Sequence, residues 1–149
     1  MRAVVQRVSE ALVRIDGEEC GRIAAGLLVY LGVGDKDTRK DMEYLADKIT
    51  HLRIFPDSQG KMNVSALEAG AEILVVSQFT LYGDTRKGRR PSYCHAAAPG
   101  SAEQYYLELV ENLRAQGFRV ETGRFAALMD VVYTNHGPVT ILIDSHRLF

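Results

Sequence analysis

The sequence has no tryptophan, only two cysteines and no long apolar run, and each absence narrows the classes of protein that fit it. Cys20 and Cys94 form no CxxC pair, so we expect no disulfide framework and a reducing, cytoplasmic location. No segment approaches the roughly 18 apolar residues that a membrane span needs. Arg2, Arg7 and Arg14 interrupt the apolar residues of the N-terminal region, so we also expect no signal peptide.

The sequence also has no excess of positive charge. The formal net charge is -1 and the sequence pI is about 6.4, whereas proteins that wrap nucleic acid present a broad basic face. We therefore expect no DNA partner, although a local basic patch is compatible with this balance. A length of 149 residues with 46% hydrophobic content predicts a single domain over 1–149, in which 145–149 form a tail of no assigned role.

Several catalytic signatures are also absent. The histidines show neither HxxxH nor HExxH spacing; they are His51, His95, His136 and His146. Cys94 beside His95 has no further ligands nearby, so no metal site is expected. There is no GxSxG, P-loop or GxGxxG motif, and Gly32-Val33-Gly34 lacks the third glycine of the last. The sequence therefore predicts neither a metal nor a cofactor.

Strand and turn patterns cover much of the chain. Residues 11–15 place Ala11, Val13 and Ile15 on one face, and the Asp16-Gly17 pair that follows is typical of a hairpin turn. Residues 26–34 form an apolar run between glycines, which predicts a strand buried on both faces. Further strands are predicted over 72–76, 128–134 and 139–143. Because proline donates no hydrogen bond to a ladder, we expect Pro138 at a strand start or a sheet edge.

Two segments have helical spacing. Apolar residues recur every three or four positions between Asp37 and Leu52, which predicts one helix there. A second helix is predicted after Pro99-Gly100, with a capping box over 101–104 and Gly117 as its stop. Because strands and helices do not alternate regularly, we expect an α+β fold with a curved, mostly antiparallel or mixed, barrel-like sheet and two main helices.

Two polar segments interrupt the apolar pattern at predicted strand ends. Ser77, Gln78, Phe79 and Thr80 follow one strand, at a sheet rim of the kind that active sites favour. Residues 135–140 read Asn-His-Gly-Pro-Val-Thr and place a Gly-Pro pair between two strands. On pattern alone, the more common interpretation of residues 77–80 is a strand that leaves the core, and that of residues 135–140 is an ordinary turn. Only about 5–6% of X-Pro bonds in folded proteins are cis.

A third segment is strongly basic. Its cations surround Gly88 and are Arg86, Lys87, Arg89 and Arg90. Arginine makes forked contacts with phosphate, and glycine lets the backbone approach closely. A solvated loop explains the same charges nearly as well, but this density in a chain of net charge -1 favours a small anion site suited to the end of a nucleic acid.

Together these segments resemble a known family. Ser-Gln-Phe-Thr at 77–80 and Asn-His-Gly-Pro-Val-Thr at 135–140 match the two signature motifs of D-aminoacyl-tRNA deacylases. Further matches lie at 5–8, 26–29, 53–55, 60–63, 90–92 and 122–125, in the family's order. The resemblance runs from residue 1 to about residue 144 and implies the fold of that family.

The resemblance implies a homodimer with two active sites at the subunit interface. Ser77 to Thr80 of one subunit would face Gly137-Pro138 of the other, with a cis bond between the glycine and the proline. The two carbonyls of that pair would accept the substrate's α-amino group and leave no room for an L side chain, whereas a D side chain would point towards solvent. Arg7 would brace the partner's Gly-Pro loop, with Asn135 and Thr140 in supporting positions.

The reaction implied by the resemblance is hydrolysis of the ester bond between a D-amino acid and tRNA. Glycine mischarged on a noncognate tRNA would also be released, because it has no side chain to exclude. The amide around Phe79, with Thr80 nearby, would stabilise the oxyanion, and the 2′-hydroxyl of the terminal adenosine would assist the attack. His136 occupies a variable position and is given no catalytic role. The cations assigned to tRNA phosphates are Arg86, Lys87, Arg89 and Arg90.

Two alternatives stay open at this point. A related deacylase could act on an L-amino acid mischarged on tRNA, using a wider pocket made by a trans Gly137-Pro138 bond. A non-catalytic tRNA-binding module could use the basic loop alone. It would bind tRNA without turnover, and it would leave the motifs at 77–80 and 135–140 unexplained.

Overall fold

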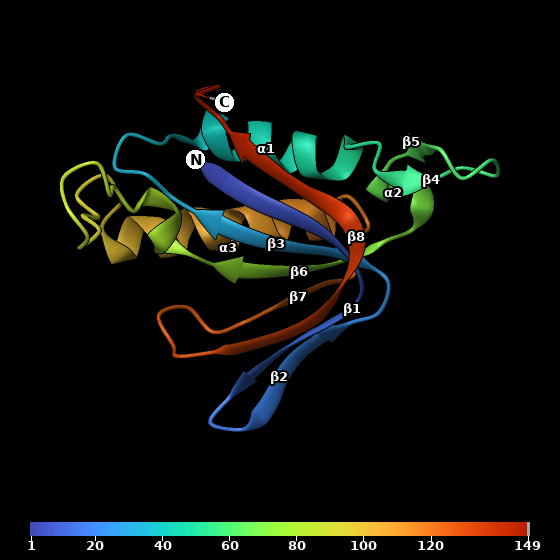
Figure 1. Ribbon diagram of the computed structural model, residues 1–149, viewed down its shortest axis with the longest axis horizontal. Coiled ribbons are helices and arrows are strands. Elements are labelled where there is room, and N and C mark those ends of the chain that lie inside the picture. Colours follow the sequence, from blue (N-terminus) through green and yellow to red (C-terminus); the bar gives the residue numbers. More distant parts are fainter. Residues whose placement is uncertain (149) are drawn as a thin grey trace.

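The computed structural model describes residues 1–148, in which a strongly curved mixed β-sheet carries its helices along one side (Figure 1). The strands are β1 Arg2–Ile15, β2 Glu18–Ile23, β3 Gly26–Gly32, β4 Phe55–Pro56, β5 Met62–Val64, β6 Glu72–Ser77, β7 Val120–Thr122 and β8 Asp130–Asp144. The helices are α1 Arg39–His51, α2 Ala66–Ala69 and α3 Pro99–Ala115, with a 3-10 turn, η1, over Phe79–Tyr82. The predicted α+β class with a curved mixed sheet is confirmed.

The long strand β1 organises the sheet. Its first half pairs antiparallel with β3 and its second half with β2, while β8 pairs antiparallel along both halves. β3 then pairs in parallel with β6, and β6 in parallel with β7. The predicted turn at Asp16-Gly17 joins β1 to β2, and both of its residues have positive φ, as a tight hairpin turn requires.

Apolar clusters lie on both faces of the sheet, as predicted for residues 26–34. Leu27 and Val29 of β3 pack in the cluster that includes the buried residues of α1 and α3, whereas Leu28 between them packs in a second cluster. β6 alternates in the same way, because successive side chains of a strand point to opposite faces. Both central strands are therefore buried on two sides, which fixes the position of the end of β6.

The predicted helices form, with one correction at a helix start. α1 spans Arg39–His51 and buries the apolar face that its spacing predicted. α3 begins at Pro99 with Ala98 as its N-cap, so the capping box expected over 101–104 is wrong. Proline suits the first helical position, where an N–H has no partner, and this starts the helix earlier. Gly117, with φ of 93°, follows the C-cap as expected. No helix within residues 1–148 is both long and apolar enough to cross a membrane.

A second correction concerns the last strands. Instead of separate strands over 128–134 and 139–143, β8 is continuous and contains a bulge. On β1 only Arg7 lies between Gln6 and Val8, yet their partners on β8 are Thr140 and Asn135, so residues 136–139 are extruded from the ladder. β8 pairs with β1 alone among the described strands, so Pro138 lies on an edge strand as predicted.

The close approach of β3 and β6 gives a test of this architecture. A methyl group on Gly26 would collide with the backbone carbonyl oxygen of Glu72, which the parallel ladder holds in place. We predict that Gly26→Ala lowers the free energy of unfolding by about 1–3 kcal/mol, the usual cost of overpacking, measured by urea denaturation. Gly100→Ala, whose added carbon meets nothing within 4 Å, should be at least as stable as wild type. Equal losses in both variants would contradict this packing.

Candidate active site

The segment Ser77 to Thr80 lies where β6 ends and the chain turns into η1. The amide of Gln78 donates to the carbonyl of Leu31 at 2.7 Å, which continues the parallel ladder to this point. The amides of Phe79 and Thr80 then open the 3-10 turn and, within residues 1–148, donate to no backbone acceptor. The first amides of a helical turn lack partners in that turn, so both are free for an external acceptor.

A cavity of about 600 Å³ opens beside this segment. Its walls come from the end of β6, the loop before α3 and the loop before β8, and they include Ser77, Gln78, Phe79, Tyr93 and Phe125. The lining is mostly apolar with a few polar groups at one side, which is typical of small-molecule sites of this volume. The polar motif therefore borders a pocket large enough for an organic ligand.

Exposed aromatic side chains stand at the edge of this cavity. The rings of Phe79 and Tyr93 make an edge-to-face contact with centroids 5.0 Å apart, and the Phe79 residue is 56% exposed. Flat aromatic surfaces of this kind bind nucleobases by stacking. Tyr93 and the loop 125–129 were not among the site residues predicted from the sequence. The signal nearest to that loop was the family match at 122–125, to which no role was assigned.

The Gly137-Pro138 pair lies elsewhere in the same chain. Ser77 pairs with Leu31, which pairs with Ala3 of β1, whereas the bulge holding Gly137 and Pro138 lies opposite Arg7. At about 3.4 Å per residue, the stretch from Ala3 to Arg7 separates the two levels by about 14 Å. Figure 1 shows the bend of β8 at the far end of the sheet from the arrowhead of β6. One chain therefore does not bring the two motifs together.

The Gly137-Pro138 peptide bond is cis, and the bulge around it is exposed but firmly held. Arg7, which is 7% exposed, donates through Nε to the His136 carbonyl at 3.2 Å and through a terminal nitrogen to the Ile54 carbonyl. The side-chain amide of Asn135 donates to the carbonyls of Arg7 and Val139 at 3.0 and 3.1 Å. In the structure, Arg7 therefore stabilises the bulge of its own chain through these hydrogen bonds.

Thr140, the last of the predicted supporting residues, lies just beyond the bulge. Its hydroxyl accepts a hydrogen bond from the Gln6 side-chain amide at 3.2 Å, and the two residues are partners in the ladder. This contact closes the bulge on the side opposite Asn135. The structure therefore brings Arg7, Asn135 and Thr140 together around the Gly-Pro pair.

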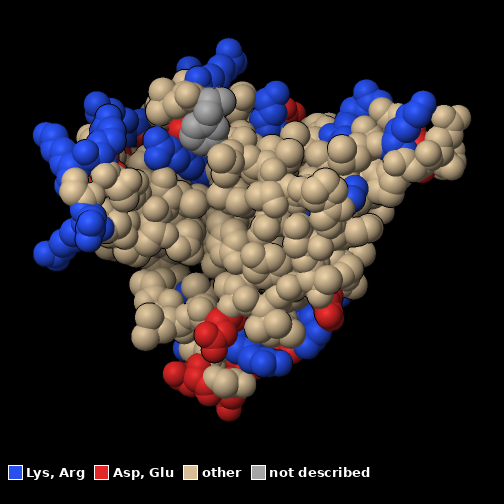
Figure 2. All heavy atoms as spheres, viewed as in Figure 1, with Lys and Arg blue, Asp and Glu red and all other residues tan. Residues whose placement is uncertain are grey.

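The basic loop lies between η1 and α3, in the same connection that supplies Tyr93 to the cavity. Arg86 forms a forked ion pair with Asp84 at 2.9 and 2.6 Å, and this guanidinium lowers the pKa of the Asp84 carboxyl. The remaining cations of the loop have no ion pair within the described chain and are exposed; they are Lys87, Arg89 and Arg90. Figure 2 shows Lys and Arg side chains gathered at this end of the molecule.

In the described part of the chain, no histidine ring is hydrogen-bonded to Ser77 or Thr80. Within residues 1–148, the hydrogen-bonded histidine rings are those of His51 and His146, whose partners lie in α1 and at Asp37. The Thr80 hydroxyl instead accepts from the side-chain amide of Gln78. Within the described residues, this segment offers backbone donors and a pocket, and no histidine is hydrogen-bonded to its hydroxyl groups.

One cluster has the composition of a metal site. Atoms of Asp37, Asp41 and His146 lie within 4.8 Å of one another. However, the Asp37 carboxylate already accepts hydrogen bonds from the Met1 α-ammonium, the Gly34 amide and the Tyr82 hydroxyl. Its oxygens are occupied by protein donors, which favours a structural role over metal ligation.

The chain is similar to a known protein family, to named relatives and to a solved structure. The sequence profile of the family described as D-Tyr-tRNA(Tyr) deacylase matches residues 4–144. Proteins named D-aminoacyl-tRNA deacylase from Syntrophobacter fumaroxidans and Thermotoga petrophila are each 56% identical over 149 residues, covering 100% of both chains. A solved structure, the c-Myc DNA Unwinding Element Binding Protein, superposes with a TM-score of 0.91 at 40% identity, covering 97% of this chain and 98% of that chain.

The hydrogen bonds from Arg7 to the bulge can be tested by replacing this arginine. Arg7→Met keeps much of the side-chain volume but leaves the His136 and Ile54 carbonyls without their donor. The Ile54 carbonyl is buried, and an unpaired buried acceptor costs about 1–3 kcal/mol, so we predict a loss of that size in a urea unfolding experiment. Arg14→Met, at an exposed position of the same strand, is the control and should change stability little. A loss confined to Arg14→Met, or equal losses in both, would refute the assignment.

Proposed function

This chain belongs to the D-Tyr-tRNA(Tyr) deacylase family, and we propose that it hydrolyses the ester bond between a D-amino acid and tRNA, releasing the free amino acid and the tRNA. It is a hydrolase that acts in translation quality control, for which the cytoplasm is the proposed location. The observation that carries the proposal is the pair of free amides at Phe79 and Thr80, at the rim of a pocket in a chain that matches the family from end to end.

The chemistry follows from those amides. When water attacks an ester carbonyl, negative charge develops on its oxygen, and fixed backbone donors stabilise that charge without reorganising. The amides of Phe79 and Thr80 are the proposed donors, while Ser77 and Gln78 position the substrate. Removing one such donor lowers rates by about 10²–10³ in enzymes generally. The 2′-hydroxyl of the terminal adenosine is proposed to assist the attacking water, because the chain supplies no base beside Ser77.

A second chain is proposed to complete the site. The Gly137-Pro138 bulge is exposed, stands on an edge strand and is remote from the pocket of its own chain. A two-fold axis would place each bulge at the partner's Ser77 to Thr80 segment, so that one interface forms both sites. There the carbonyls of Gly137 and Pro138 would receive the substrate's α-amino group and occupy the space that an L side chain requires.

This arrangement selects by exclusion. A D side chain points away from the bulge, and the site does not select by its size, so many D-amino acids are accepted. Glycine on a noncognate tRNA is a proposed second substrate, because it has no side chain to collide with the carbonyls. A steric clash with rigid backbone discriminates more strongly than attraction to any one side chain could.

The basic loop is proposed to contact phosphates near the 3′ end of the tRNA. Arg86 is committed to Asp84 and shapes the loop, which leaves Lys87, Arg89 and Arg90 for the nucleic acid. The loop continues into Tyr93 at the cavity, so a bound acceptor end would pass the cations as it enters. One similar structure is named for DNA binding, and the alternatives of a DNA partner or of RNA binding without turnover are separated by the experiments below.

The central test is release of D-tyrosine, L-tyrosine and glycine from matched charged tRNAs. We expect the D-tyrosyl and glycyl esters to be hydrolysed at least about a hundredfold faster than the L-tyrosyl ester, since a clash with fixed backbone exceeds the effect of removing a single methylene group. Equal rates for the two enantiomers would end the chiral hypothesis. Binding of charged tRNA without release of any amino acid would favour the non-catalytic alternative.

The basic loop is tested by charge reversal. A variant with Lys87, Arg89 and Arg90 all changed to Glu should have a higher KM for charged tRNA and a weaker dependence of KM on salt, with kcat unchanged at saturation. Each phosphate that no longer binds a cation should lower the slope of log affinity against log salt by about 0.7, as for single strands. Lys40→Glu, exposed on α1, serves as the control. Inhibition of wild type by duplex DNA as strong as that by uncharged tRNA would contradict selectivity for tRNA.

A further inference from the structure

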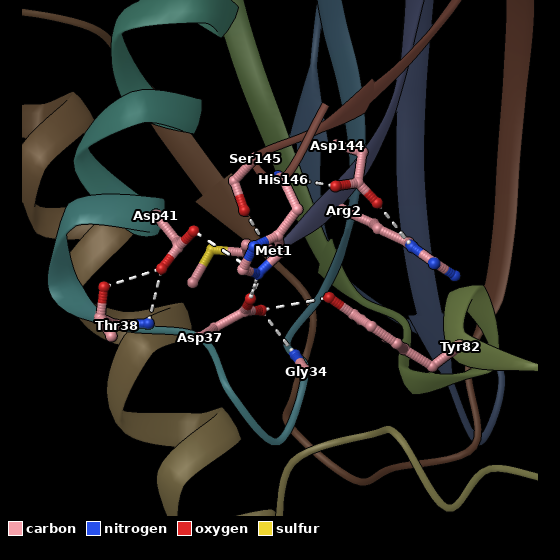
Figure 3. Close-up of polar contacts among 10 residues, drawn as sticks. All are labelled: Met1, Arg2, Gly34, Asp37, Thr38, Asp41, Tyr82, Asp144, Ser145 and His146. Carbon is pink, nitrogen blue, oxygen red and sulfur yellow. Dashed lines mark hydrogen bonds and ion pairs between the residues drawn. The ribbon is translucent and has the colours of Figure 1, made fainter. Parts of the chain in front are cut away.

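A buried polar cluster contacts η1 at Tyr82, a residue that does not line the cavity beside Ser77 (Figure 3). The Asp37 side chain is 1% exposed, and one of its oxygens accepts from the Met1 α-ammonium at 2.5 Å. The other oxygen accepts from the Gly34 amide at 2.6 Å and from the Tyr82 hydroxyl at 3.1 Å. Figure 3 shows Asp37 between Met1 and Tyr82, so this carboxylate links the end of η1 to the start of β1.

Arg2 provides a second anchor for the same turn. Its guanidinium donates to the Leu81 carbonyl at 2.9 Å and lies 4.5 Å from the centroid of the Tyr82 ring. A further bond to Asp144 at 2.9 Å, whose carboxylate is itself buried, fixes the orientation of the guanidinium. The last two residues of η1 are therefore held by side chains from β1 and from the segment before α1, and Asp144 of β8 orients Arg2.

Two glycines make room for this contact. A Cβ atom on Gly34 would lie 2.7 Å from the Tyr82 hydroxyl oxygen, and one on Gly32 would lie 3.0 Å from the Gln78 carbonyl oxygen. The Gly32-Val33-Gly34 segment, which matched no nucleotide-binding motif, is thus the surface on which η1 packs. Burial, and then the neighbouring Asp37 carboxylate, raises the pKa of the Tyr82 hydroxyl far above its usual range, so that it remains a donor.

We propose that Asp37 and Tyr82 are positioning residues for the deacylation, which fix η1 and thereby the Phe79 and Thr80 amides at its other end. This inference rests on the proposed function. Neither residue lines the cavity beside Ser77, and both border a separate cavity of about 660 Å³. We therefore infer that they act through the turn and not from the wall of the cavity beside Ser77.

The internal bonds of η1 cannot fix it alone. The turn has four residues, and the backbone bonds at its two ends run from the Leu81 amide to the Gln78 carbonyl at 3.2 Å and from the Gly83 amide to the Thr80 carbonyl at 3.0 Å. Short 3-10 turns have poor hydrogen-bond geometry, so their position depends on what anchors them. A displacement of about 1 Å in a catalytic group can lower a rate by about a hundredfold. The cluster at Asp37 is the anchor that keeps the two amides at a fixed place.

The first test is Tyr82→Phe, which removes one hydroxyl and leaves the ring. We expect kcat for D-tyrosyl-tRNA to fall about ten- to a hundredfold, with KM changed less than about twofold, because substrate contacts are untouched. Thr50→Val, which removes a buried hydroxyl from α1, controls for reduced stability and should keep kcat. A Tyr82→Phe enzyme with wild-type kcat would overturn the inference.

Gly34→Ala tests the same contact from the other side, since its methyl group must displace the Tyr82 ring. Its kcat should fall as in Tyr82→Phe, whereas Gly100→Ala should keep the wild-type value. Asp37→Asn combined with Tyr82→Phe should lose little more activity than the more damaging of the two single changes, because both break one link. Fully multiplicative losses would contradict a shared role.

Amide hydrogen exchange gives a readout that does not depend on activity. The amides of Leu81 and Gly83 should exchange faster in Tyr82→Phe and Gly34→Ala than in wild type, Thr50→Val or Gly100→Ala. Unchanged exchange at these amides would overturn the inference. A wild-type enzyme that does not release D-tyrosine would overturn the proposed function, while the exchange result would still decide whether the cluster anchors η1.

Discussion

The register of the antiparallel ladders on β1 is the constraint on which the rest of the site depends. Through β3 it sets the level at which β6 ends and η1 begins, and through β8 it sets the level at which the Gly137-Pro138 bulge leaves the sheet. These levels differ by about 14 Å at the spacing of extended strands. A one-residue slip would exchange the buried and exposed faces of β1, so the separation is fixed by the core. One chain therefore keeps the two motifs apart, and we propose that two copies bring them together.

In this protein, buried charged side chains hold backbone groups in place. The Arg7 guanidinium binds carbonyls at the bulge, and the Asp37 carboxylate binds an amide, a hydroxyl and an ammonium group beside η1. Both fix main-chain groups that are proposed to meet the substrate, namely the carbonyls of the bulge and the amides of Phe79 and Thr80. A site that works through backbone dipoles needs rigid supports more than reactive side chains, because preorganised groups stabilise developing charge without moving.

Much of the fold could be predicted from the sequence because it depends on local spacing. The helix over 39–51 and the doubly buried strand at 26–32 have patterns that few alternatives share. The continuity of β8 could not be predicted, because a proline within a sequence indicates the end of a strand unless the opposing strand is known. The pocket wall at 125–129 shows no local pattern, and the partners of Asp37 come from Met1 and from the segment near residue 82. Contacts between distant segments are what a single sequence leaves out.

The account is tested most directly by mixing two inactive variants. Phe79→Pro removes one proposed oxyanion donor at the first position of a 3-10 turn, which tolerates proline. Gly137→Val adds bulk to the bulge, where an added Cβ meets, within the described chain, only the Asn135 side chain at 3.6 Å. If the site is shared, exchanged dimers contain one intact site, and an equal mixture should recover about a quarter of wild-type D-tyrosyl-tRNA hydrolysis for a two-fold dimer. Activity no higher than the sum of the separate variants, with subunit exchange verified, would contradict a site built from two chains.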